Sequence, residues 1–223
     1  MLERLELLIG NENIDKLRNR KVLVIGVGGV GGYAVEILAR SGVGSLVLVD
    51  PDIVEETNIN RQLVALTSTI GQYKVDVLKN RIEDMGLGTS VTVIKEFMTA
   101  SNIEKYLEVD FVIDACDTLP TKLSIIENCI KKKIPFISSM GTGNKMDPSK
   151  LEIVDLDKTS YDPVAKRLRK LVREANIHGK IPVVSSKEEK RVDGEKVIPS
   201  NAFVPASAGI LCASYIINQM ISR

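Results

Sequence analysis

The feature that most constrains the fold of this chain is a glycine-rich loop between an apolar run and an amphipathic stretch. The run from Lys21 to Gly26 is rich in β-branched residues, and further glycines follow at Gly28, Gly29 and Gly31. Apolar residues then recur at helical spacing as far as residue 40. Glycines in such a loop let the backbone approach a phosphate and direct amide groups at it from a helix start. The context predicts a nucleotide site, and the alternative is a tight structural turn.

Strand and helix patterns alternate through the first two thirds of the chain. Short apolar runs predict further strands at 45–49, 91–94, 111–113 and 135–139. Helical spacing predicts helices at 75–85, 102–107 and 119–132. This alternation predicts an α/β, Rossmann-like doubly wound, mostly parallel sheet with helices on both faces and a C-terminal extension. Ligands of such sheets lie beyond the carboxyl ends of the strands.

The length of 223 residues fits a single domain over 1–223, with the nucleotide-binding core at about 20–140 and a C-terminal elaboration at 150–223. In the elaboration the pattern loosens at 151–156, and the sequence then predicts a basic helix at 163–174, an extended run at 182–185, a polar stretch at 187–196 and a last helix at 207–220. The apolar stretch that contains the last helix is interrupted by Pro205 and by polar residues that are costly facing lipid. We therefore expect that helix to pack on the sheet, and no membrane partner.

Charge and cysteine content narrow the class of protein. The formal net charge is +1, so contact with nucleic acid requires a local patch. Cys116, Cys129 and Cys212 have no short-range pairing, which argues against a disulfide framework and a structural zinc site. We expect a cytoplasmic protein. Cys116 is a candidate nucleophile, but no basic partner is evident and packing is the simpler role.

Two carboxylates compete for the ribose of the nucleotide. Asp50 ends the strand at 45–49, 24 residues after Gly26, near the position where an acidic residue accepts a ribose hydroxyl. Asp52 is the weaker candidate. The alternative for Asp50 is that it only caps the following turn.

A polar cluster after the second strand indicates which kind of nucleotide binds. Asn58, Asn60, Arg61 and Gln62 lie in a predicted loop entering a helix, and Lys74 follows. Redox enzymes neutralise the pyrophosphate of NAD mostly with backbone amides. An additional arginine and lysine therefore favour a triphosphate, which carries more negative charge. For each cation the alternative is a solvated surface position.

Asp117 follows the strand at 111–113 by a short turn. A carboxylate at this place can hold Mg²⁺ against a triphosphate, because that ion prefers oxygen ligands. Asp114, at the strand end itself, has the simpler structural role.

Together these motifs resemble the ubiquitin-activating-like adenylating family, and the resemblance runs over nearly all of the chain. The stretches around 138–148, 155–160 and 162–169 narrow it to the tRNA threonylcarbamoyladenosine dehydratases within that family. The resemblance implies ATP and Mg²⁺ as cofactors. It also implies adenylation of a carboxylate on a modified tRNA adenosine, followed by ring closure with release of AMP and pyrophosphate.

The resemblance also assigns roles to residues. Arg61, Lys74 and Asp117 would carry the adenylation, and Arg4 would reach the phosphate site of a second subunit, which implies a homodimer. The alternative for Arg4 is a loose terminal cation. The resemblance leaves open a sulfur-transfer protein as a further partner.

One basic patch is a candidate contact for the modified tRNA, with a solvated helix face as the alternative: Lys166, Arg167, Arg169, Lys170 and Arg173. The main rival function is an adenylyltransferase that activates the C-terminus of a ubiquitin-like or sulfur-carrier protein. A nicotinamide dehydrogenase and a nucleotide-sensing module are the weaker rivals.

Overall fold

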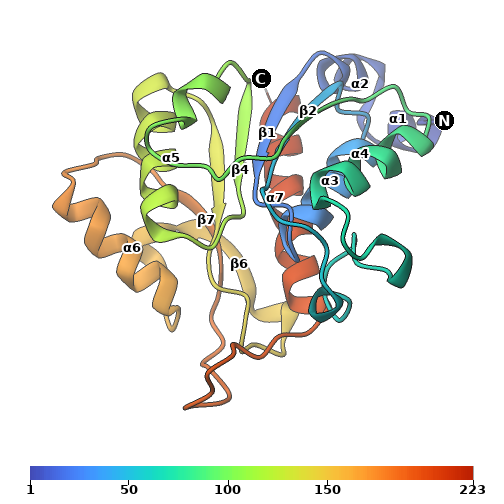
Figure 1. Cartoon of the computed structure of the whole chain (residues 1–223). Coiled ribbons are helices and arrows are strands. Elements are labelled where there is room, and N and C mark those ends of the chain that lie inside the picture. The colour runs from blue at the N-terminus through green and yellow to red at the C-terminus, as the bar shows by residue number, and fades with distance from the viewer. Residues whose placement is uncertain (223) are drawn as a thin grey trace.

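The computed structural model describes residues 1–222 and contains a seven-stranded sheet with helices on both faces (Figure 1). The strand order is β3-β2-β1-β4-β5-β7-β6, and all neighbours are parallel except β6, which runs antiparallel to β7. The strands are β1 (Lys21–Ile25), β2 (Ser45–Val49), β3 (Ser90–Ile94), β4 (Phe111–Asp114), β5 (Phe136–Ser139), β6 (Leu151–Asp155) and β7 (Pro182–Ser186). The predicted doubly wound, mostly parallel architecture is confirmed.

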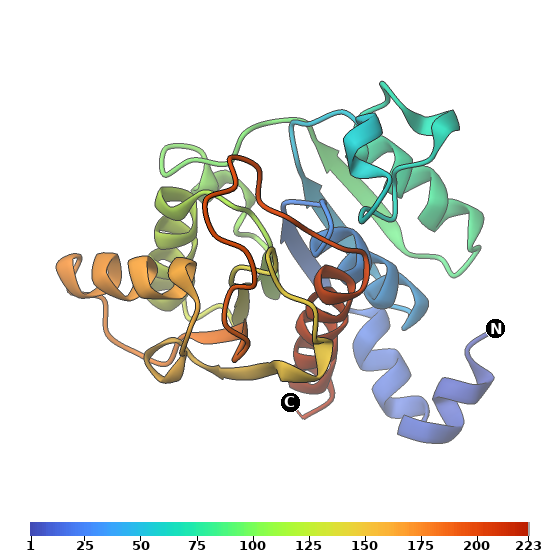
Figure 2. The ribbon, with the colours of Figure 1, turned by 90° about the horizontal axis from the view of Figure 1, so that it is seen from below.

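The helices divide between the two faces of the sheet. One face carries α2 (Asn11–Arg18), α3 (Gly31–Arg40), α4 (Lys74–Asp84) and α7 (Phe203–Ile221). The other face carries α5 (Leu119–Lys132) and α6 (Pro163–Glu174), and Figures 1 and 2 show α6 outside α5 at the periphery. Short 3₁₀ turns lie in the connections: η1 (Glu56–Asn58), η2 (Thr67–Thr69), η3 (Ile103–Tyr106), η4 (Pro148–Lys150) and η5 (Leu156–Lys158).

Burial on both faces explains why the central strands are apolar without interruption. In β1, Val22 and Val24 pack in one core cluster and Leu23 and Ile25 in the other. The register pairs Ile25 with Val49 on one side and with Asp114 on the other. The ends of β1, β2 and β4 therefore meet at one edge of the sheet.

The sequence did not predict two features of the fold. At the N-terminus, α1 (Glu3–Ile9) and α2 form a helical hairpin, and no residue of α1 is buried. The antiparallel placement of β6 beside β7 also had no sequence signal, because it depends on where the chain returns after β5.

Helix α7 begins at Phe203, earlier than predicted, because Pro205 fits the first turn of a helix. The side chain of Asn201 accepts a hydrogen bond from the Val204 amide at 2.9 Å and holds that start. By length and composition α7 could span a membrane. In the structure it packs on α3 and the sheet and buries residues such as Ala208 and Cys212, as expected for a core helix.

A segment without helix or strand, residues 187–202, is named here the strap. Asn144 anchors it, since its side chain bonds the backbone of Arg191 and Val192. The Asn144 amide also donates to the Pro199 carbonyl at 2.7 Å. The strap thereby brings residues distant in sequence to the carboxyl edge of the sheet.

The contact between α7 and α3 leads to a stability prediction. A Cβ at Gly209 would lie 2.2 Å from the carbonyl oxygen of Val30, so Gly209→Ala forces the two helices apart. We expect it to lower the free energy of unfolding by about 3 kcal/mol in urea titrations. The control Ile210→Ala changes the next, half-exposed position and should cost less than about 1 kcal/mol. Equal costs for the two variants would contradict this packing.

Candidate active site

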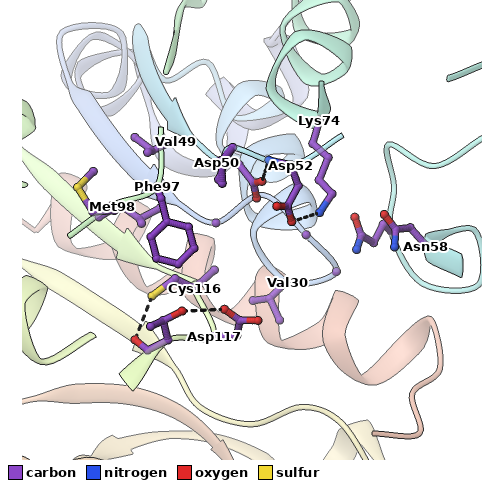
Figure 3. A pocket seen from close by; sticks show the side chains of 18 of the residues that line it. Val30, Val49, Asp50, Asp52, Asn58, Lys74, Phe97, Met98, Cys116 and Asp117 are labelled. Carbon is purple, nitrogen blue, oxygen red and sulfur yellow. Dashed lines mark hydrogen bonds and ion pairs between the residues drawn. The ribbon is translucent and has the colours of Figure 1, made fainter. Parts of the chain in front are cut away.

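A cavity of about 690 Å³ opens at the carboxyl edge of the sheet (Figure 3). Its walls come from the ends of β1, β2, β3 and β4, from the loop before α4, and from the strap. Most of the residues that the sequence singled out line it: Gly26, Gly28, Gly29, Asp50, Asn58, Arg61, Gln62, Lys74 and Asp117.

The loop glycines have two different roles. Gly26 has a φ of 82°, and a Cβ at Gly31 would lie 1.8 Å from the Gly26 carbonyl oxygen, so these two allow close packing. Gly31 is not part of the cavity wall. Gly28 faces the cavity, and a Cβ there would meet nothing closer than the Gln62 side chain at 3.7 Å. The exposed part of the loop thus leaves room for a ligand beside backbone amides.

Asp50 is a buried carboxylate at the end of β2. One oxygen accepts the Val27 amide of the glycine loop at 2.8 Å, and the other accepts the Asp52 amide at 2.9 Å. Burial raises the pKa of the Asp50 carboxyl above its ordinary value, although both amides oppose that shift. Asp50 caps the following turn and shapes the glycine loop, and it also lines the cavity. Binding of a ribose by Asp50 stays a prediction.

Lys74 is the first residue of α4 and is almost fully buried. Its ammonium lies 2.7 Å from the carboxylate of Asp52, which is 62% exposed. Backbone pairing fixes both residues, since the Lys74 amide donates to the Asp52 carbonyl at 3.0 Å. A desolvated ammonium beside the glycine loop is suited to an anionic ligand that displaces Asp52.

The polar cluster around η1 has three inward members and one outward member. Arg61 lines the cavity while its guanidinium donates to the Thr57 carbonyl at 2.8 Å. Gln62 is buried, and its side-chain carbonyl oxygen has no hydrogen-bond partner among residues 1–222. Asn58 also lines the cavity. Asn60 is exposed, lies outside the wall, and bonds the Ser200 carbonyl of the strap at 3.1 Å.

Asp117 is an exposed carboxylate on the cavity wall. One oxygen accepts the Thr118 hydroxyl at 3.2 Å, and the other makes no hydrogen bond within the described chain. Among residues 1–222, no three His, Cys, Asp or Glu side chains are grouped to hold a metal. A Mg²⁺ ion here fits only if phosphates and water supply most of its ligands, which is how proteins commonly bind it.

A buried ion pair that sequence analysis missed supports the floor of the cavity. The ammonium of Lys122 lies 3.0 Å from Asp114 and donates to the Ser139 carbonyl at 2.8 Å. Burial acts to lower the pKa of Lys122, but the charge and hydrogen bond of Asp114, together with the neighbouring Cys116, outweigh it, so the pKa lies above its ordinary value. Asp114 also accepts the amide of Cys116 at 3.2 Å and so holds the turn that carries Asp117. The structural role expected for Asp114 agrees with this geometry.

Cys116 lines the cavity but is a poor nucleophile. Burial, together with the charge of Asp114, raises the pKa of its thiol far above the ordinary value. Its sulfur contacts the Thr118 carbonyl at 3.8 Å. Burial likewise raises the pKa of Cys129 and Cys212 to about 12. These values support packing roles for the cysteines.

The apolar wall of the cavity was also missed. Phe97 and Met98 follow β3, and Figure 3 shows the Phe97 ring facing the cavity near Val49 and Cys116. A flat apolar surface beyond the ribose position suits a nucleotide base. The rule that ligands lie beyond strand ends could have drawn attention to Phe97. Ser200 and Pro205 also line the cavity and had no local sequence signal.

Two predicted elements lie outside this cavity. Arg4 is exposed on α1 and does not line the cavity of its own chain. In the basic patch, Arg169 is half-buried and donates to the Thr159 carbonyl at 3.0 Å, while Lys170 and Arg173 pair with Glu174 and Asp157 at the surface. Lys166 and Arg167 are exposed and make no ion pair within the described residues.

The Lys74–Asp52 pair predicts opposite effects of two charge-removing substitutions. Lys74→Met should weaken ATP binding about 10- to 100-fold, because a charge-assisted contact to phosphate is lost. Asp52→Asn should tighten it about two- to fivefold, because it frees the ammonium and removes a like charge from the anion site. Isothermal titration calorimetry measures both.

The matched control is Lys79→Met, which removes an exposed ammonium from the same helix. It should leave the dissociation constant unchanged. Weaker binding by Asp52→Asn would contradict the proposed exchange of Lys74 from carboxylate to phosphate.

Comparison with known proteins agrees with this geometry. The ThiF family model matches residues 2–218. The chain is 42% identical to the tRNA threonylcarbamoyladenosine dehydratase of Bacillus subtilis (strain 168), with 98% of this chain and 93% of that protein covered. It is 35% identical to the enzyme of the same name from Escherichia coli (strain K12), covering 92% of this chain and 76% of that protein.

A solved structure of the E. coli tRNA N6-threonylcarbamoyladenosine dehydratase in complex with ATP superposes with a TM-score of 0.94. The alignment has 32% sequence identity and covers 99% of this chain and 93% of the other.

Proposed function

Because the chain belongs to the ThiF family, we propose that it is an ATP-dependent tRNA threonylcarbamoyladenosine dehydratase. The observation that carries this function is the convergence of Lys74, Arg61 and Asp117 on a cavity that begins at a phosphate-binding loop. A redox enzyme for NAD does not need this set of cations. The family and the site together favour adenylation of a carboxylate.

The residues on the cavity wall fit ATP. Gly28 leaves space beside backbone amides, and the unpartnered oxygen of Gln62 is suited to a hydroxyl or amino donor. When bound, ATP supplies an α-phosphate that the threonyl carboxylate attacks, with pyrophosphate leaving and a carbamoyl nitrogen then closing the ring with release of AMP. Both reactants are anions, so Lys74 and Arg61 lower the cost of bringing them together and stabilise the charge on the departing pyrophosphate.

Mg²⁺ is part of the proposal, with Asp117 as the protein ligand. Asp117 lines the cavity, and one of its carboxylate oxygens has no hydrogen-bond partner within the described residues. Replacing that carboxylate should affect the chemical step more than nucleotide binding, because the ion neutralises charge that shifts onto the leaving pyrophosphate.

Pyrophosphate exchange into ATP tests the function. We expect exchange to depend on threonylcarbamoylated tRNA and to be insensitive to a sulfur-carrier or ubiquitin-like protein. With Asp117→Asn, exchange should fall at least about 100-fold, while the dissociation constant for ATP changes less than about threefold. The matched control Asp157→Asn removes an exposed carboxylate from η5. Exchange stimulated only by a carrier protein would support the rival adenylyltransferase.

A homodimer is also proposed. Helix α1 buries none of its residues, and it exposes Leu7 (88%) and Leu8 (79%) beside Arg4. A helix that buries none of its residues and exposes two leucines is suited to pack on a second copy. Arg4 would then add a third cation to the phosphate site of the partner.

Subunit mixing tests this arrangement. Arg4→Ala and Lys74→Met should each be inactive alone, since each removes one cation from every site. Mixed after reversible dissociation, they should regain roughly a quarter of wild-type activity, because half of the dimers are hybrids with one intact site of two. The control mixture of Lys74→Met with Asp117→Asn should regain no activity, because both residues serve the cavity of their own chain and every hybrid dimer has two damaged sites. If Arg4→Ala is inactive alone and its mixture with Lys74→Met shows no recovery, Arg4 acts in its own chain; an active Arg4→Ala protein would mean that Arg4 has no role.

The remaining partners follow from the proposed substrate. Lys166 and Arg167 are the members of the basic patch available to tRNA phosphates, whereas Arg169 is committed to the Thr159 loop. We also propose a cytoplasmic location, consistent with three unpaired cysteines. We also propose a sulfur-transfer protein as a partner, and this proposal rests on the family resemblance alone.

A further inference from the structure

Tyr161 is an exposed aromatic residue whose ring and hydroxyl are both left to solvent. Its side chain is 61% exposed, the highest value for any aromatic residue in the part of the chain that the structure describes. Its hydroxyl makes no hydrogen bond with residues 1–222. A large ring left in solvent without a partner is a candidate contact for another molecule.

The backbone holds Tyr161 in a conformation that side chains disfavour. Its φ is 57°, in the left-handed region. On one side Thr159 is fixed by its hydroxyl bond to the Leu156 carbonyl at 2.8 Å and by Arg169. On the other side Asp162 caps α6, accepting the Val164 amide at 2.8 Å. The positions two residues before and one residue after Tyr161 are thus fixed, which limits how far the ring can move.

This loop lies on the same side of the molecule as the cavity. The Asp162 carboxylate is 3.4 and 3.6 Å from the position a Cβ would take on Gly141, and the next residue, Thr142, lines the cavity. Along the chain, Lys158 lies three residues before Tyr161, and Lys166 and Arg167 follow in the first turns of α6. All three are exposed and make no ion pair among the described residues.

We propose that Tyr161 is a stacking platform for an unpaired base of the tRNA anticodon loop, with Lys158, Lys166 and Arg167 contacting the adjoining phosphates. The proposal rests on the proposed function. Unpaired bases offer their faces to aromatic rings, whereas bases in a duplex do not, and cations beside the ring hold the backbone. The platform would fix the loop while the modified adenosine enters the cavity.

Tyr161→Gly separates recognition from folding, because glycine removes the ring and also relieves the left-handed strain. We expect the dissociation constant for a synthetic anticodon stem-loop, measured by fluorescence anisotropy, to rise about tenfold. The melting temperature should stay the same or rise, and calorimetric ATP binding should not change. The slope of log affinity against log salt should be unchanged for Tyr161→Gly but smaller by about 0.7 for Lys166→Gln.

Tyr161→Trp gives a direct signal, since the chain contains no tryptophan. Its emission should be quenched by the stem-loop and not by a duplex RNA of equal length, with affinity within about threefold of wild type. Unchanged affinity in Tyr161→Gly, or tryptophan emission that ignores the stem-loop, would overturn the platform even if the wild-type protein cyclises the tRNA. A wild-type protein that neither binds the stem-loop nor cyclises the tRNA would instead overturn the proposed function.

Discussion

The site depends on how closely the backbone approaches itself where β1 ends. Gly26, Gly31 and Ala115 meet so tightly that a Cβ at Gly31 would lie 1.8 Å from the Gly26 carbonyl oxygen and 3.3 Å from the Ala115 side chain. This contact places the start of α3 over the ends of β1 and β4. The loop between them can then face the cavity with its amides, and Asp50 fixes its shape from the neighbouring strand.

Charge is arranged in layers around that loop. Beneath the cavity, Lys122 and Asp114 neutralise each other in the core and hold the turn that carries Asp117. Along the wall, the Lys74 ammonium pairs with the exposed carboxylate of Asp52, which a triphosphate can replace. The buried pair is costly to break and therefore rigid, whereas the half-exposed pair can exchange partners. The Lys122–Asp114 pair therefore keeps the floor of the cavity fixed. The Lys74 ammonium is neutralised by Asp52 in the free protein and is released to bind an anion when a ligand enters.

The sequence predicted the central sheet, the loop and most of the cavity wall, because strand ends and helix starts leave local patterns. It did not predict the partner of Asp114, since Lys122 reaches it only after α5 folds back over β4. It placed Asn60 with the ligand residues, yet the strap draws that amide outward to Ser200. Arg169 looked like a surface cation, but the turn before α6 captures it. These cases share one cause: long-range contacts decided where a side chain points.

The central claim is that a substrate carboxylate is joined to AMP before the ring closes. Threonylcarbamoylated tRNA labelled with ¹⁸O in that carboxylate, incubated with the protein, ATP and Mg²⁺, tests the claim by mass spectrometry of the released AMP. The account predicts that a labelled oxygen appears in AMP for each cyclised adenosine. Cyclised tRNA accompanied by unlabelled AMP would contradict it.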